Sequence, residues 1–226
     1  MVDLFGGSED FLVVLAADIS ALNASSLEGI PHIPCSLRAY QDLGLYSERD
    51  ALWRCGDYSL YLARRHYPSA SFFWLMENDL YINTSDRASF FRGLNRAGFD
   101  FLASRFCLTG EGWGWYSSMS AHYSDVYQCL FPFVGISGEA VDYAYGKRVE
   151  LSSLRAMSKS NELWPNDESF MATVLANSKF KCSDLNCDGD DIYSRSTLRL
   201  TPPISLKILE GKERDGFLYH PVLSGE

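Results

Sequence analysis

The stretch FFWLMENDLYI, residues 72–82, joins an almost unbroken apolar run to two carboxylates one position apart. A short apolar run that is rich in aromatic residues and bounded by Pro68 and Asn83 is typical of a strand buried on both faces of a largely parallel sheet. Glu77 and Asp79 share one face because side chains alternate along a strand. Open α/β sheets place ligands at the carboxyl ends of their strands, so the pair predicts a compact negative site there.

A divalent cation is the simplest partner for Glu77 and Asp79, and a phosphate-bearing substrate is the simplest reason to hold a cation. The pattern Glu-x-Asp is short, however, and two solvated carboxylates at a strand end explain it equally well when the strand is considered alone. The rest of the chain has to decide between the two interpretations.

Composition indicates one domain of moderate size. Its 226 residues are 46% hydrophobic and 14% aromatic, which is enough for one domain with a substantial core. The formal charge of -9 argues against nucleic acid as a partner. No apolar stretch reaches the ~20 residues of an integral membrane segment, and the start MVDLFGGSED lacks a basic segment and a cleavage pattern. We therefore expect a cytoplasmic protein whose six cysteines are reduced thiols.

Two segments before residue 72 extend a strand and helix pattern. The apolar run Phe11–Ala17 predicts a second buried strand. Asp50–His66 has apolar residues near helical spacing and three basic residues before Pro68, which predicts a helix. Strand, helix and strand in this order predict a βαβ unit, and therefore a mixed, mostly parallel sheet flanked by helices.

Later segments supply further candidate residues. The glycine- and tryptophan-rich loop 110–116 suits stacking against a sugar or a base, although a packed surface loop is the commoner meaning of such a sequence. Asp167 and Glu168 begin a predicted helix, where they either stabilise the helix dipole or place a general base at the mouth of the sheet. His220 either packs against its neighbours or completes a metal shell begun by Asp79.

The order of these motifs resembles a group of bacterial glycosyltransferase-like proteins with the nucleotide-diphosphosugar transferase (A-type) fold. The resemblance covers Phe11 to Val222 and rests on six motifs: WxxGD at 53–57, FWLMENDL at 73–80, WGWY at 113–116, FPFVGIS at 131–137, Glu168 at a helix start, and LYHPV at 218–222. The strand of Glu77 is more remotely similar to that of fungal α-mannosyltransferases. The Phe11 strand resembles the second strand of this fold, so we expect a single domain over residues 1–226 that lacks the first strand and helix.

The resemblance implies a metal-dependent enzyme that moves a sugar from a nucleotide-diphosphate donor to an acceptor hydroxyl. Asp79 would coordinate Mn²⁺ or Mg²⁺ bridging the donor diphosphate. Glu77 would hold the donor ribose or orient the metal shell, and His220 would be a late metal or phosphate ligand. Glu168, with Asp167 as its close rival, would be the acceptor-side carboxylate that activates the hydroxyl.

The resemblance also implies a donor pocket. Trp113, Trp115 and Ser137 would line the sugar, while Gly56 and Asp57 would lie near the nucleotide. A basic residue often found before the position of Ser137 is replaced here by Gly135-Ile136, which removes a phosphate contact. Two other functions stay open: a catalytically inactive nucleotide- or sugar-binding module, and a nucleotidyltransferase on a similar sheet.

Overall fold

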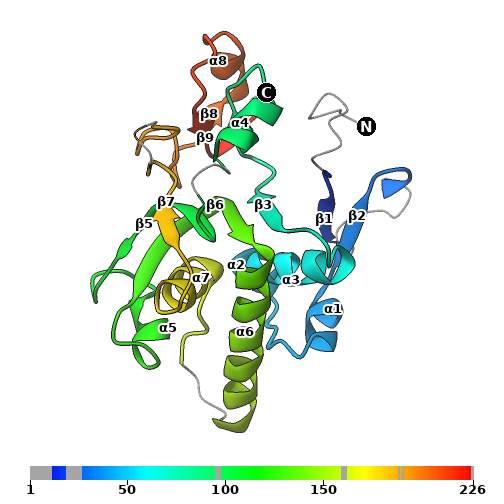
Figure 1. Cartoon of the computed structure of the whole chain (residues 1–226), viewed down its shortest axis with the longest axis vertical. Helices are drawn as coiled ribbons and strands as arrows, with labels where there is room; N and C mark the ends of the chain where they lie inside the picture. Colours follow the sequence, from blue (N-terminus) through cyan, green and yellow to red (C-terminus); the bar gives the residue numbers. More distant parts are fainter. Residues whose placement is uncertain are drawn as a thin grey trace.

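The computed structural model describes residues 12–18, 27–94, 98–158, 162–187, 189 and 191–224. Within these residues the chain forms a four-stranded central sheet and three two-stranded sheets, with helices around them (Figure 1). The mixed α/β class predicted from the sequence is therefore confirmed.

The central sheet has the strand order β3-β6-β5-β7. Its strands are β3 (Phe72–Met76), β5 (Phe101–Leu108), β6 (Tyr127–Ser137) and β7 (Cys182–Asp184). The strand β6 is antiparallel to both β3 and β5, and β7 is parallel to β5. The strands β3, β5 and β7 thus share one direction, with their carboxyl ends at one edge, and β6 lies between β3 and β5 in the opposite direction.

This pairing corrects the expected sheet. Two of the three strand pairs of the central sheet are antiparallel, so a mostly parallel sheet is not what the structure shows. The apolar runs predict where strands form, but the direction of a strand depends on connections that carry no comparable local signal. The strand β3 is at one end of the sheet and only half buried, and Met76 is 39% exposed. The prediction of a strand buried on both faces is therefore wrong.

The amino-terminal strands form a sheet of their own. The strand β1 (Leu15–Asp18) pairs in parallel with β2 (His32–Cys35), and neither pairs with β3. The predicted strand Phe11–Ala17 overlaps β1 in its second half, but Phe11 lies outside the described residues. Leu15 and Ala16 are exposed and only Ala17 of the four residues is buried, so β1 is not buried on both faces. The predicted βαβ unit does not form within one sheet.

Eight helices are described. They are α1 (Leu37–Asp42), α2 (Ala51–Arg54), α3 (Asp57–His66), α4 (Arg87–Leu94), α5 (Tyr116–Ser120), α6 (Gly138–Ser158), α7 (Asp167–Ala176) and α8 (Leu206–Glu210). The single helix predicted over Asp50–His66 is divided into α2 and α3 at Gly56. The amide of Gly56 donates to Asp167 Oδ2 at 2.8 Å, a partner from a distant helix that a local pattern does not reveal.

The central sheet has an apolar cluster on each face. On one face, α6 and α7 pack against residues such as Phe101, Ala103 and Val134 (Figure 1). On the other, Leu102 and Phe133 join a second cluster with residues of α4 and of the segment after residue 190. Neighbouring residues of one strand belong to different clusters because side chains alternate between the two faces.

Gly135 makes the second cluster possible. It lies opposite Trp74 in the register of β3 and β6, and a Cβ atom at this position would lie 2.5 Å from the Trp74 ring. With this space free, the Trp74 ring stacks on Phe133, with ring centroids 5.0 Å apart and planes 15° apart. The glycine is therefore required by side-chain packing.

The segment after residue 190 gathers beyond the carboxyl end of β3 (Figure 1). The short strand β4 (Tyr81–Ile82) pairs with β9 (Leu218–Tyr219), and β8 (Ile204–Ser205) pairs with β10 (Val222–Leu223). These pairings carry residue 220 to the end of β3. Among the described residues, none of the helices has both the length and the apolar character needed to cross a bilayer.

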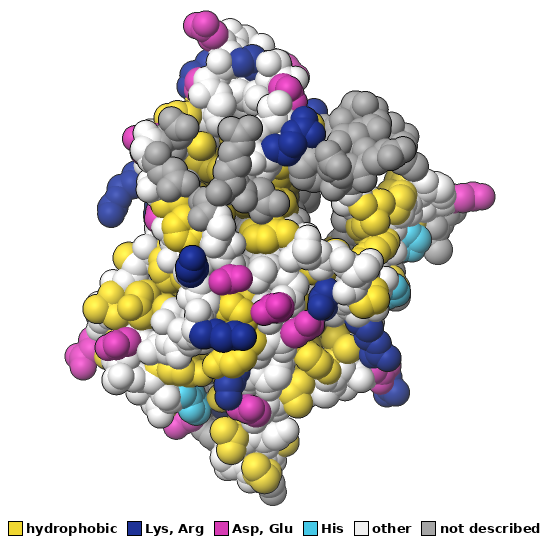
Figure 2. All heavy atoms as spheres, in the orientation of Figure 1, with side chains coloured by type: hydrophobic (Ala, Val, Ile, Leu, Met, Phe, Trp, Pro, Cys, Tyr) yellow, Lys and Arg dark blue, Asp and Glu magenta, His cyan; other side chains and the backbone are white. Residues whose placement is uncertain are grey.

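Acidic and basic side chains are interspersed over the face shown in Figure 2. Among the residues drawn in colour, this face carries no broad basic patch of the kind that binds a nucleic-acid backbone.

Candidate metal centre

Backbone hydrogen bonds fix the two carboxylates at the end of β3. The amide of Glu77 donates to the carbonyl of Pro132 at 2.9 Å and thereby continues the pairing with β6. The amide of Leu80 donates to the carbonyl of Glu77, which turns the chain, and Val222 donates to the carbonyl of Asp79 at 2.8 Å. Glu77 and Asp79 are thus anchored to the sheet on one side and to the carboxy-terminal segment on the other.

His220 completes a cluster with these carboxylates. Its Nε2 lies 3.1 Å from Glu77 Oε2 and 3.3 Å from Asp79 Oδ1. One potential ligand atom from each of the three residues lies within 4.8 Å of the other two. The side chain of His220 is 8% exposed, whereas those of Glu77 and Asp79 are 47% and 28% exposed, so the cluster opens to solvent on its carboxylate side.

The surroundings of His220 determine which nitrogen is available. Nδ1 lies 3.0 Å from the carbonyl oxygen of Arg199, which can only accept, so Nδ1 carries a proton. Nε2 therefore faces the carboxylates, either as a second N–H donor or with a free lone pair. A histidine held by Nδ1–H to a backbone carbonyl, with Nε2 directed at carboxylates, is the usual arrangement of a metal ligand.

Two effects oppose each other at His220. Burial lowers the pKa of its imidazole, but the hydrogen bond with Glu77 and the charges of Asp79 and Glu77 outweigh burial, and the pKa is raised overall. The two carboxylates thus favour the protonated form of His220. A divalent cation would compete with the Nε2 proton for the same lone pair.

Glu168 belongs to the same region. It lies at the start of α7, where Asn166 Oδ1 accepts the amide of Ser169 at 3.0 Å and Asn166 Nδ2 donates to Glu168 Oε2 at 3.2 Å. Burial raises the pKa of Glu168, and the negative charge of Glu77 raises it further, while the donor from Asn166 lowers it. The negative charges of Glu77 and Glu168 thus act on each other.

Asp167 is oriented differently from Glu168. Its Oδ2 accepts the amide of Gly56 at 2.8 Å, and its Oδ1 accepts the amide of Glu168 at 2.7 Å. The residue is 7% exposed, and burial raises the pKa of its carboxyl well above the ordinary value. A Cβ atom on Gly56 would lie 2.9 Å from Asp167 Oδ2, so the glycine allows this contact. Gly56 and Asp167 thereby join the start of α3 to the start of α7.

Asp57 has a structural role. Its carboxylate forms a fully buried ion pair with Arg148, with Oδ2 2.8 Å from Nε and Oδ1 3.1 Å from Nη2. Burial alone would lower the pKa of Arg148, but the charge of Asp57 raises it overall. The pair joins α3 to α6, and both side chains are 0% exposed. The expectation that Asp57 lies near a nucleotide is therefore corrected, because its carboxylate has no access to solvent.

Ser137 lies at the opposite end of the sheet from the carboxylates. It pairs with Phe72, the first residue of β3, whereas Glu77 follows the last residue of β3. The five residues of β3 separate the two positions by roughly 15 Å. The Ser137 hydroxyl donates to Asp100 Oδ1 at 3.0 Å and accepts the amide of Ala140 at 3.3 Å, which caps α6. The predicted place of Ser137 in the sugar pocket is corrected accordingly.

The two tryptophans lie on the loop that follows β5. Trp113 and Trp115 are both partly exposed, and the guanidinium of Arg54 lies 5.2 Å from the ring centroid of Trp115. This loop follows Leu108, which pairs with Tyr127, whereas Glu77 is bonded to Pro132, farther along β6. The contacts of the described residues do not join either tryptophan to the metal cluster.

Arg105 is a residue of this region that the sequence analysis missed. It lies within β5, and its positive charge lowers the pKa of Glu168. The signal that finds Glu77 also applies here, since Arg105 interrupts the apolar run FLASRFCL. A charged residue within an apolar strand needs a partner or a function.

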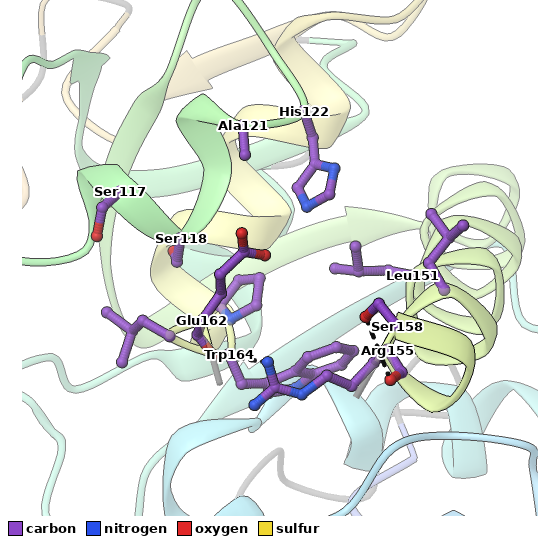
Figure 3. A pocket seen from close by; sticks show the side chains of 12 residues that line it. Ser117, Ser118, Ala121, His122, Leu151, Arg155, Ser158, Glu162 and Trp164 are labelled. Atoms are coloured by element: carbon purple, nitrogen blue, oxygen red, sulfur yellow. Dashed lines mark hydrogen bonds between the residues drawn. The ribbon is translucent and has the colours of Figure 1, made fainter. Parts of the chain in front are cut away.

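A separate pocket of about 300 Å³ lies between α5, α6 and the chain that leads into α7 (Figure 3). The imidazole of His122 and the carboxylate of Glu162 point into it, and Arg155 and Trp164 form part of its wall (Figure 3). It contains none of the residues proposed from the sequence, and Glu77, Asp79 and His220 do not line it.

No protein family, curated protein or solved structure matches the chain. The function is therefore argued from the motifs of the sequence and the geometry of the cluster.

Proposed function

We propose that the chain is a metal-dependent glycosyltransferase that moves a sugar from a nucleotide-diphosphate donor to an acceptor hydroxyl. The supporting observation is the convergence of Glu77, Asp79 and His220 at the end of β3, with Glu168 as their electrostatic neighbour. The residues come from three distant parts of the chain, and two of them are acids that a sheet edge does not require for folding. The proposal includes a nucleotide-sugar donor as partner and a cytoplasmic location.

The donor atoms favour Mn²⁺ over Mg²⁺ as the cation. Glu77 and Asp79 offer carboxylate oxygens, which suit both ions, but His220 offers an imidazole nitrogen, and Mg²⁺ prefers oxygen ligands. The anchoring of Nδ1 by Arg199 orients this nitrogen towards the carboxylates. Bound there, a divalent cation would neutralise the charge that develops on the leaving nucleoside diphosphate.

Glu168 is the better candidate for the general base. Its carboxylate has a raised pKa, is influenced by the charge of Glu77, and is held by Asn166. It would accept the proton of the acceptor hydroxyl as that oxygen attacks the sugar. Asp167 is the weaker candidate because its two oxygens already accept the amides of Gly56 and Glu168. Trp113 and Trp115 stay candidates for sugar stacking because their side chains are partly exposed.

Binding of Mn²⁺ and of nucleoside diphosphates tests this function. We expect the parent chain to bind Mn²⁺ in calorimetry, and one nucleoside diphosphate to raise its unfolding midpoint only when Mn²⁺ is present, because a ligand of the native state stabilises it by mass action. Asp79→Asn should weaken Mn²⁺ binding by about tenfold or more, as expected when a charged ligand is lost. Glu168→Gln should keep this binding and lower transfer of the sugar.

Asp125→Asn is the matched control, because it also removes one exposed carboxylate but lies far along the chain from the cluster, between α5 and β6. It should bind Mn²⁺ like the parent. The proposal fails if Asp79→Asn binds Mn²⁺ and nucleotide as tightly as the parent does. Binding of nucleotide and metal without any turnover would identify an inactive binding module, and turnover of nucleoside triphosphates would identify a nucleotidyltransferase.

A further inference from the structure

Arg105 has a backbone conformation that arginine rarely adopts. Its φ is 55°, and among the described residues it is the one non-glycine residue with positive φ. It lies where the register of β5 and β6 shifts: Ser104 is opposite Leu130, whereas Cys107 is opposite Gln128. The strand β5 thus carries an extra residue at Arg105, which is a β-bulge. Bulges redirect a side chain out of the regular alternation and are common beside active sites.

Side chains of the neighbouring strand β7 and of the segment after it hold this bulge in place. The amide of Arg105 donates to the hydroxyl of Tyr193 at 2.8 Å, and this hydroxyl donates to Asp184 at 2.7 Å. The same carboxylate accepts the amide of Phe106 at 3.1 Å. Tyr193 is buried. The unusual conformation is therefore maintained by several specific contacts, and strain maintained in this way is characteristic of functional positions.

The guanidinium of Arg105 is bound to the segment that carries His220. Its Nη2 donates to the carbonyl of Leu198 at 2.5 Å, and Leu198 forms a β-bridge with His220. The positive charge of Arg105 also lowers the pKa of Glu168. Arg105 is thus held by the segment of a proposed metal ligand, and its charge acts on the proposed base.

The guanidinium is also incompletely paired. Its Nε is buried without a hydrogen-bond partner, and none of the ion pairs found within the described residues includes Arg105. The Nε atoms of Arg54 and Arg199 are buried without a partner too, whereas Arg148 is paired with Asp57 and Arg64 with Asp142. A buried donor without an acceptor is costly and is usually matched by water or by a ligand.

We propose that Arg105 binds an oxyanion of the substrate beside Glu168. The inference deepens the proposed function, on which it rests, because it states that the substrate carries a phosphate or carboxylate oxygen at the Glu168 end of the site as well as at the metal end. The planar fork of a guanidinium suits such a group. In the sequence motif, Gly135-Ile136 replace a basic residue that would contact phosphate. Arg105 offers a positive charge in its place.

The variant Arg105→Asn separates binding from folding. Asparagine tolerates positive φ better than arginine does, so the bulge can persist while the guanidinium is removed. Binding of inorganic pyrophosphate and of Mn²⁺ alone is measured by calorimetry, together with the unfolding midpoint in urea. We expect the folded variant to bind pyrophosphate about tenfold or more weakly, as for a lost charged hydrogen bond, with Mn²⁺ affinity retained and with a midpoint lowered only by the loss of the bond to Leu198. Arg38→Asn, an exposed arginine of α1, is the control and should leave all three quantities unchanged.

The same measurements have outcomes that would overturn the inference or separate it from the proposed function. The inference is overturned if the parent binds neither pyrophosphate nor phosphate, or if Arg105→Asn binds pyrophosphate like the parent. If Arg105→Asn does not fold, Arg105→Lys decides: weaker pyrophosphate binding at an unchanged midpoint supports the inference, and unchanged binding overturns it. Pyrophosphate binding that depends on Arg105 in a chain that binds no Mn²⁺ would sustain the inference and refute the metal-dependent function.

Nucleoside diphosphates then distinguish two sources of the oxyanion. If Arg105→Asn also weakens the nucleoside diphosphate, the donor carries the oxyanion. If it weakens inorganic phosphate and leaves the nucleoside diphosphate unchanged, the acceptor carries it.

Discussion

The buried pair of Asp57 and Arg148 gives the sharpest test of a structural assignment against a binding role. Asp57→Ala removes the acceptor of three donors: Arg148 Nε at 2.8 Å, Arg148 Nη2 at 3.1 Å and the Tyr61 hydroxyl at 2.8 Å. Arg148 stays in the core, 0% exposed, with its guanidinium 3.8 Å from the ring centroid of Phe170. Only the bond from Nη1 to the carbonyl of Pro165 is retained among its described hydrogen bonds. The variant therefore leaves a buried cation without a counter-charge.

The magnitude follows from two independent considerations. Removing one partner of a buried ion pair costs about 3–5 kcal/mol. Losing two hydrogen bonds to a charged group at about 1.5–3 kcal/mol each gives a similar range. For a chain of this size each kcal/mol lowers the unfolding midpoint by about 2–4 °C, so we expect a decrease of roughly 6–20 °C. Urea unfolding and thermal unfolding both measure this loss.

Two control variants make the result specific. Asp57→Ala combined with Arg148→Met removes both charges and should recover much of the stability, because replacing both partners of a buried pair by apolar groups is often neutral. Asp142→Ala breaks the partly exposed pair with Arg64 and should cost less than about 1 kcal/mol. A loss below about 1 kcal/mol in Asp57→Ala, together with weaker nucleotide binding, would refute the structural assignment and restore the role expected from the sequence.

Two further predictions concern packing and pH. Gly135→Ala places a Cβ atom 2.5 Å from the Trp74 ring and 2.9 Å from Phe72, so it should destabilise the chain by about 1–3 kcal/mol in urea unfolding; an unchanged midpoint would contradict the packing described for β3 and β6. Burial raises the pKa of Asp167, so its contribution to stability is fully present below its unfolded pKa, about 3.9, and is lost as pH rises through the folded pKa. The stability of Asp167→Asn relative to the parent should therefore increase as pH rises above about 4, and a constant difference would show that burial does not raise the pKa of Asp167.

The fold was predictable from sequence where local chemistry determines it. The apolar run around Trp74 forms a strand, and Asp167 and Glu168 lie in the first turn of a helix, as their residue types indicate. The direction of β6 and the break at Gly56 were not predictable, because each depends on a partner more than fifty positions away. Such pairings are set by long connections and by packing, which leave no periodic signal.

In the candidate site, too, the features set by local sequence were predictable and those set by distant partners were not. The proximity of Glu77 and Asp79 follows from the period of a strand, and their encounter with His220 agrees with the order of motifs. Ser137 was misplaced because a serine before a helix is used as its cap, and a motif does not distinguish a cap from a ligand. Arg105 was missed because its positive φ and its bulge depend on Tyr193, which lies on another part of the chain.

Glu77 and His220 are 143 positions apart in the sequence, although their side chains touch. A ribosome that adds about 5–20 residues per second needs roughly 7–30 s to pass from one to the other. During this interval the nascent chain presents the two acids without their imidazole, and β4 has no β9 to pair with. The three-residue cluster can form only after translation has passed residue 220, so its formation reports that the carboxy-terminal segment has been made and has docked.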